Sequence, residues 1–165
     1  MAEFCPFPAV GAPSFSKPAA YSRTVTALAC LIALFDAAHV HHDAAHAWFG
    51  VEGAGGWATC PLTENAVVRI LSSPQYPGRR TTMQDARSRL ANFCATHGHA
   101  FWPDLVSLRD SSVFHLQHVQ GHRQLTDIYL LALAVHQGGR LATFDAGIPL
   151  KSVAGAERKN LQILR

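Results

Sequence analysis

Three acidic side chains occupy positions at which carboxylates could assemble into a metal site. Glu64 occurs in the phrase LTE after a short apolar run, Asp127 in the phrase LTD, and Asp145 directly after the apolar run LATF. Carboxylates crowded together repel one another, and such a group persists most readily when a hard cation such as Mg²⁺ lies between them. A site of this kind orients a water molecule and stabilises the charge that develops on a phosphodiester, which is the chemistry of metal-assisted hydrolysis.

Each of the three acids also has a purely structural interpretation. A carboxylate in the first turn of a helix complements the helix dipole, and the threonine before it could cap that helix, which would account for Glu64 and Asp127. Asp145 begins the phrase DAG, which is typical of a tight turn. The metal-binding interpretation is favoured only if the fold brings the three acids to one edge of a sheet.

Short apolar strands alternate with amphipathic helices along the chain. We predict strands over residues 25–28, 57–60, 99–102, 140–144 and 161–164. We predict helices over residues 30–35, 42–49, 82–96, 111–119 and 126–136, and one more that is capped by Thr63. This alternation is typical of a parallel sheet that helices cover on both faces. The expected fold class is therefore α/β, and ligands of such a sheet bind beyond the carboxyl ends of its strands.

Two groups of apolar side chains are expected to face the interior. The inner face predicted for the helix over residues 82–96 consists of Met83, Ala86, Leu90 and Phe93. Three aromatic residues each lie on a predicted strand, so we expect them in the core rather than as base-stacking platforms. They are Trp57, Phe101 and Trp102.

Length and composition are those of one folded domain preceded by a lead. The chain has 165 residues, of which 48% are hydrophobic, and this is enough to bury a core. Its 14 Lys and Arg residues exceed its 11 Asp and Glu residues, a balance that is compatible with nucleic-acid binding without requiring it. The proline-bearing residues 1–23 follow neither helical nor strand periodicity and are predicted to be an unstructured lead, with the folded domain over residues 24–165.

The apolar run over residues 24–35 resembles a secretion signal only superficially. It is too short to span a membrane, and Asp36 and several histidines follow where a small-residue cleavage site would stand. The cysteines lack the close spacing of a zinc knuckle or redox motif, which predicts free thiols in a reducing compartment. The four cysteines are Cys5, Cys30, Cys60 and Cys94. We therefore expect a cytoplasmic protein with no membrane attachment.

Two further clusters each have competing interpretations. His42 and His46 stand four residues apart and could chelate zinc from one helix face, but the absence of an evident third ligand favours a solvated or interface-facing helix. The densest basic stretch is either a solvated helix face or an edge that follows RNA phosphates, in which case RNA affinity would fall with salt. Its members are Arg79, Arg80, Arg87 and Arg89.

Six phrases that occur in order along the chain carry a family resemblance. They are LIALFD (31–36), AHVHHDAAHAWF (38–49), CPLTEN (60–65), FWPD (101–104), HRQLTDIYLLALA (122–134) and GGRLATFD (138–145). From about Ala27 to Leu164 the chain resembles the VapC toxins, which are PIN-domain ribonucleases of bacterial toxin–antitoxin pairs. Any one phrase is a weak signal, but the set is highly specific.

The resemblance implies a three-layer α/β/α PIN-like domain with a central parallel sheet of about four or five strands. It also implies an endoribonuclease that acts on RNA and depends on Mg²⁺, with Mn²⁺ as an alternative metal. A small antitoxin would hold the enzyme inactive, and the protein would form a homodimer. By motif position, three of the family's four metal-binding acids would be Glu64, Asp127 and Asp145. The residues expected to contact the substrate are Thr63, Asn65, Arg79, Arg80 and Thr143.

The fourth acidic position of the family is lost in this chain. Family members usually open with a strand that ends in Asp-x-Asn, and the corresponding residues here are Ala27 and Ala29. Alanine cannot ligate a metal, and Asp36 does not obviously replace the missing acid because it lies roughly 13 Å further along a helix axis. Either the chain is a degenerate family member that binds an antitoxin or RNA without cleavage, or the sequence before Cys30 comes from a shifted reading frame or a misassigned start.

Overall fold

A single all-parallel sheet forms the centre of the domain. The computed structural model describes residues 23–165, so all of the predicted lead except Arg23 lies outside the described residues. The strands are β1 (Thr24–Thr26), β2 (Trp57–Thr59), β3 (His99–Phe101), β4 (Arg140–Thr143) and β5 (Leu161–Ile163). They pair in the order β3-β2-β1-β4-β5, and every pair is parallel. The predicted sheet of about four or five parallel strands is confirmed.

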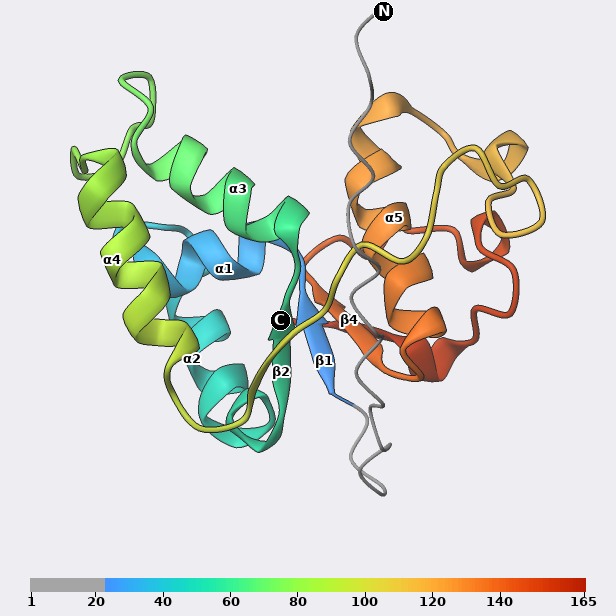
Figure 1. Cartoon of the computed structure of the whole chain (residues 1–165), viewed down its shortest axis with the longest axis horizontal. Coiled ribbons are helices and arrows are strands. Elements are labelled where there is room, and N and C mark those ends of the chain that lie inside the picture. The colour runs from blue at the N-terminus through green and yellow to red at the C-terminus, as the bar shows by residue number, and fades with distance from the viewer. Residues whose placement is uncertain (1–22) are drawn as a thin grey trace, which may run out of the picture.

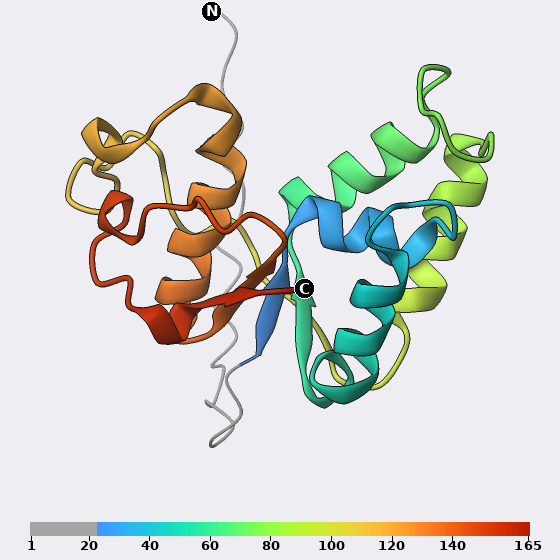
Figure 2. The ribbon, with the colours of Figure 1, turned by 180° about the vertical axis from the view of Figure 1, so that it is seen from behind.

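Helices cover both faces of this sheet. They are α1 (Leu28–Phe35), α2 (His42–Val51), α3 (Pro61–Leu71), α4 (Met83–Cys94) and α5 (Leu125–His136). Figure 1 shows α1 to α4 gathered on one side of the strands and α5 on the other, and Figure 2 shows the same layers from behind. The predicted three-layer α/β/α architecture is confirmed.

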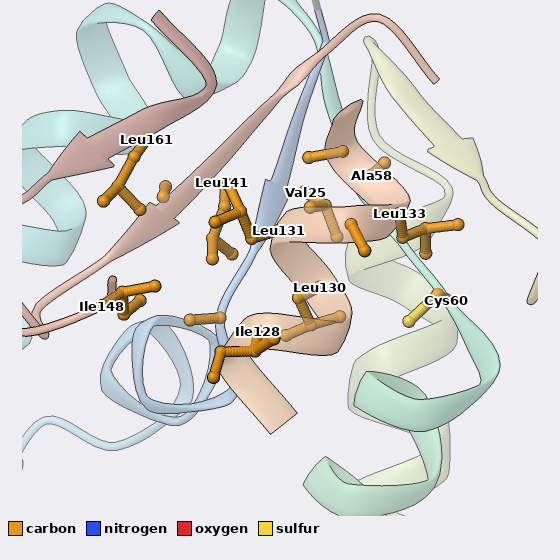
Figure 3. Packing of buried hydrophobic residues seen from close by; sticks show 14 of the residues in the cluster. Val25, Ala58, Cys60, Ile128, Leu130, Leu131, Leu133, Leu141, Ile148 and Leu161 are labelled. Carbon is orange, nitrogen blue, oxygen red and sulfur yellow. The ribbon is translucent and has the colours of Figure 1, made fainter. Parts of the chain in front are cut away.

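The main hydrophobic core lies between α5 and the sheet. Nearly every side chain in the middle of α5 is buried, as expected for a helix that is apolar on all sides. Register places Val25 of β1 beside Ala58 of β2 and Leu141 of β4, so that the same face of three strands meets α5. Figure 3 shows Leu131 of α5 beside this row. The position of α5 is therefore fixed by the central strands.

One predicted helix is wrong. Residues 111–119 form turns and a short 3₁₀ turn (Leu116–His118) instead of an α-helix. The physical reason is tertiary: Phe114 is buried and forms an isolated antiparallel bridge with Val153. The backbone N–H of His115 donates to the carbonyl of Ser152 at 2.9 Å, so the hydrogen bonds that a helix would use are made with a distant segment.

Three smaller predictions about boundaries and burial are also corrected. Leu28 begins α1 rather than ending β1. Met83, at the start of α4, is 71% exposed, whereas Ala86 and Leu90 are buried as predicted. Phe101 is 52% exposed because β3 is an edge strand, whereas Trp57 and Trp102 lie in the core. Within residues 23–165, no helix has both the length and the apolar character that crossing a membrane would require.

We predict that Leu131→Ala lowers the free energy of unfolding by about 2–5 kcal/mol, because it leaves a cavity between α5 and the sheet. Urea unfolding monitored by circular dichroism measures this change. The matched control is Leu105→Ala, which removes the same atoms from a side chain that is 54% exposed. Its cost should stay below about 1 kcal/mol, since surface substitutions change stability little. Equal losses in the two variants would contradict the assigned core.

Candidate active site at the carboxyl edge of the sheet

The carboxyl ends of β2 and β4 lead directly into a helix and a turn that carry two of the acidic residues, and the third lies at the start of α5. Glu64 lies in the first turn of α3, directly beyond β2, and Asp127 lies in the first turn of α5. Asp145 stands two residues beyond the end of β4. Because helix N-termini present free N–H groups and a positive dipole end, this edge of the sheet favours anionic groups.

Asp127 and Asp145 act on each other electrostatically. The pKa of Asp127 is raised to about 6, first because its carboxyl group is removed from water and second because the charge of Asp145 lies nearby. The same carboxylate contributes to the environment of Cys30 in α1: burial, with a smaller effect of Asp127, raises the pKa of that thiol to about 12. The structure thus brings two of the three predicted acids together.

Asp145 is held by a tight turn of its own. Its backbone N–H donates to Thr143 Oγ1 at 3.1 Å, and its Oδ1 accepts a hydrogen bond from the backbone N–H of Gly147 at 2.7 Å. A Cβ at Gly147 would stand only 3.1 Å from Oδ1, so glycine permits this close approach. The turn expected at DAG is present, and the hydroxyl of the buried Thr143 is one of the groups that orients it.

Glu64 faces a different set of partners at the same edge. One of its carboxylate oxygens accepts a hydrogen bond from the hydroxyl of Thr59 at 2.6 Å, and that hydroxyl lies 2.8 Å from Nε2 of His99. Cys94, the last residue of α4, completes the group, and the metal-ligating atoms of Glu64, Cys94 and His99 all lie within 4.8 Å of one another. These contacts turn Glu64 toward β3 and α4, whereas Asp127 interacts with Asp145.

Neither threonine in the two LT phrases is the N-cap residue of its helix. The N-cap of α3 is Cys60, and Pro61 occupies the first helical position. Thr63 is fully buried, and its hydroxyl accepts a hydrogen bond from the backbone N–H of Cys60 at 3.0 Å. The N-cap of α5 is Gln124, so that Thr126 lies inside this helix. The helix predicted to be capped by Thr63 therefore begins three residues earlier than expected. Asn65, next to Glu64, is exposed.

Ala27 lies at the junction of β1 and α1, in the middle of the acidic edge. It is the N-cap residue of α1, with φ −59° and ψ 155°, and it makes no side-chain cap. Its backbone N–H donates to the carbonyl of Ala142 at 2.8 Å, and the residue is 1% exposed. The position at which the family usually has an aspartate is thus buried beside β4, the strand that precedes Asp145.

Arg79 and Arg80 line a cleft that lies at the far end of α1 from Ala27. This cleft has a volume of about 590 Å³, and its other charged residues are Asp36, Asp85 and Arg89. Asp36 is the C-cap residue of α1 and accepts a hydrogen bond from the hydroxyl of Tyr76 at 2.5 Å, which lowers the pKa of Asp36. Asp36 therefore belongs to this cleft and does not take the place of the missing acid.

The histidine pair of α2 contacts the end of α1. Nδ1 of His42 lies 2.8 Å from the carbonyl oxygen of Ala33, and Nε2 of His46 lies 3.2 Å from that of Leu34. The carbonyls in the last turn of a helix have no partners within the helix, and these rings can satisfy them. The contacts give the histidine pair a structural role within the domain, at the end of α1.

Cys94 and His99 are polar groups of the site region that sequence reasoning missed. They stand 30 and 35 residues beyond Glu64, on different elements, so no short spacing signals their proximity. Cys94 and the buried Cys30 and Cys60 are free thiols, as predicted, and Cys5 lies outside the described residues.

The fold and its acidic edge define a three-layer α/β/α domain of the PIN-like class. The chain is 42% identical over 134 residues to ribonuclease VapC44 of Mycobacterium tuberculosis, covering 81% of this chain and 94% of that protein. It is 45% identical over 125 residues to ribonuclease VapC39 (76% and 90% covered) and 43% identical over 118 residues to ribonuclease VapC38 (72% and 82%) of the same organism. No family model matches the chain. These identities show that the chain belongs to the VapC ribonuclease family.

We predict that Asp127 makes the metal-free protein less stable as the pH rises from about 4 to 6, because the folded state binds the proton that an unfolded aspartate releases near pH 3.9. Asp127→Asn removes this ionisation. The free energy of unfolding of the variant relative to wild type should therefore increase between these pH values. Urea unfolding in the presence of EDTA measures the difference.

The control for this experiment is Asp43→Asn, which changes an exposed acid in the first turn of α2. It should show no such gain, because an exposed carboxylate in that position is stabilised by the helix dipole. A relative stability of Asp127→Asn that stays constant between the two pH values would contradict the raised pKa.

Proposed function

We propose that this chain is a metal-dependent endoribonuclease toxin that hydrolyses RNA phosphodiester bonds with Glu64, Asp127 and Asp145. Membership of the VapC family supports the activity, since the relatives are named ribonucleases. The observation that carries the assignment of the site is the electrostatic coupling of Asp127 and Asp145 at the carboxyl edge of the sheet. Two carboxylates held together in this way form a site for a cation or for a shared proton.

The residues present fit Mg²⁺. The donor set of Asp127 and Asp145 consists of carboxylate oxygens, which are the ligands that Mg²⁺ prefers, and Mn²⁺ takes the same ligands. When bound, the metal would activate a water molecule and stabilise charge on the phosphate. Asp127 and Asp145 would hold the metal, and Thr143 and Gly147 keep the carboxylate of Asp145 oriented. Asn65, exposed next to Glu64, is the neighbouring side chain best placed to reach the RNA.

A catalytically degenerate member that binds RNA or an antitoxin without cutting is the second candidate function. Two observations favour it: Ala27 supplies no ligand, and Glu64 is engaged by Thr59 rather than by the aspartate pair. In either case we propose, from the family, that the chain acts in the cytoplasm, that a small antitoxin binds it and that it forms a homodimer. These partners do not distinguish the two functions, whereas cleavage does.

We predict that Ala27→Asp increases Mg²⁺-dependent RNA cleavage by at least about tenfold, because it restores a carboxylate beside β4 and metal sites lose about 10–100-fold when one of their supporting groups is missing. The position accepts aspartate, since Ala27 is an N-cap residue without a side-chain cap and aspartate is a favoured N-cap. Cleavage of a structured RNA with Mg²⁺ or Mn²⁺, and its loss with EDTA, measures the effect. The double variant Ala27→Asp with Ala29→Asn tests the complete motif.

The matched control is Ala27→Asn. Asparagine caps a helix as well as aspartate does, but it lacks the charge. Equal cleavage by the two variants would mean that the gain comes from helix stability rather than from metal binding. If neither Ala27→Asp nor the double variant cuts any RNA tested, the nuclease assignment of the remaining acids is wrong. Cleavage by the unmodified protein that Asp127→Asn abolishes would show that the missing aspartate is dispensable.

We predict that Arg79→Ala with Arg80→Ala weakens RNA binding and flattens its dependence on salt. Each phosphate contact with single-stranded RNA contributes about 0.7 to the slope of log K against log salt, so losing two contacts should lower that slope by about 1.4. Fluorescence anisotropy at several salt concentrations measures it. The control, Arg158→Ala with Lys159→Ala, removes the same charge outside the cleft, next to β5. Equal slopes in both double variants would exclude the cleft as a phosphate-binding surface.

A further inference from the structure

We propose that Glu64, Cys94 and His99 form a binding site for a borderline-soft transition-metal ion such as Zn²⁺, separate from the paired aspartates. The three residues come from the first turn of α3, the last turn of α4 and the start of β3. Each offers one ligand atom, and these atoms all lie within 4.8 Å of one another.

The geometry requires little movement to bind a metal. With metal–ligand bonds of about 2.0–2.3 Å, neighbouring ligand atoms of a tetrahedral zinc site lie roughly 3.3–3.8 Å apart. The three atoms would therefore have to approach one another by at most about 1.5 Å, which side-chain rotation can supply. A water molecule would take the fourth position, as in zinc sites with three protein ligands.

The surroundings hold the ligands in place. The imidazole of His99 packs against the indole of the fully buried Trp57, with ring centroids 4.5 Å apart. The hydroxyl of Thr59 contacts both Glu64 and His99, so it orients two of the ligands at once. Contacts of this kind to the ligating groups strengthen metal sites.

The protonation states of the free protein also bear on binding. Burial lowers the pKa of His99, which keeps the imidazole neutral and ready to ligate. Burial, with a contribution from Glu64, raises the pKa of the Cys94 thiol to about 11. A metal must therefore displace the proton from Cys94, and that proton is released to solvent.

The donor atoms distinguish this site from the aspartate pair. A thiolate, an imidazole and a carboxylate form a mixed set that favours Zn²⁺ or Co²⁺, whereas carboxylates alone favour Mg²⁺ and Mn²⁺. Glu64 belongs to both groups. A soft metal would hold Glu64 against Cys94 and His99 and so withdraw it from the acidic edge. This inhibitory consequence rests on the proposed function, but the binding site itself does not.

Titration of the full chain with Co²⁺, after purification without a metal-affinity tag and treatment with EDTA, tests the site. A thiolate ligand gives a sulfur-to-cobalt charge-transfer absorption in the near ultraviolet. We expect this band to reach its maximum at one equivalent, and Zn²⁺ to abolish it. Cys94→Ser should remove the band, whereas Cys30→Ser, a buried thiol outside the group, should keep it. His99→Ala should weaken Co²⁺ binding at least tenfold, whereas His42→Ala should not.

Several outcomes would overturn the proposal: no thiolate band in the wild type, a band that survives Cys94→Ser, or a Co²⁺ affinity that His99→Ala leaves unchanged. The group would then be a hydrogen-bonded cluster around Thr59. Circular dichroism of each variant shows that loss of the band does not reflect unfolding. If the protein binds Co²⁺ as expected but neither it nor its Ala27→Asp variants cut RNA, this site is supported and the proposed function is contradicted, so the two are tested separately. In a variant that does cut, Zn²⁺ should inhibit cleavage, and Cys94→Ser should relieve that inhibition.

Discussion

The parallel pairing of β1 with both β2 and β4 is the constraint on which the rest of the domain depends. Parallel neighbours cannot be joined by a hairpin, so each strand must be followed by a crossover that returns over one face of the sheet. The carboxyl ends of all the strands therefore meet at one edge. In this chain the edge carries the start of α1, the start of α3 and the turn after β4. Residues far apart in sequence become neighbours there without needing any direct attraction.

Carboxylates that lie close together at this edge repel one another, and the acids at the edge respond in two ways. Asp127 and Asp145 remain together, and the pKa of Asp127 is raised by the burial of its carboxyl group and, to a lesser extent, by the charge of Asp145. Glu64 avoids that repulsion by accepting the hydroxyl hydrogen bond of Thr59. Alanine at position 27 adds no further charge to the centre of this edge. At the proposed metal site, alanine would also supply one ligand fewer than aspartate.

The sequence was sufficient to predict the sheet, its helices and the shared edge, because strand and helix periodicity and the positions of acids after strands are local patterns. It was insufficient wherever a distant segment decides the outcome. The helix predicted over residues 111–119 fails because Phe114 pairs with Val153. The direction of the Glu64 side chain depends on Thr59, which precedes it by five residues, and on His99, which lies 35 residues away. A local pattern can place a residue at an edge but cannot say which neighbour it will face.

Glu64 is the residue that the two proposed metal sites share. Its position in the first turn of α3 puts it at the carboxyl edge of the sheet, and its hydrogen bond to Thr59 holds it beside Cys94 and His99. One carboxylate cannot ligate a metal at both proposed sites at once. A metal that binds Glu64 at one site therefore weakens metal binding at the other. With aspartate at position 27, a hard metal would have four carboxylates to draw on and the balance would shift toward the aspartate pair. With alanine there, the sulfur and imidazole donors would compete for Glu64 against fewer carboxylates. If both proposed sites bind metal, the residue at position 27 would then affect the choice of metal as well as the number of ligands.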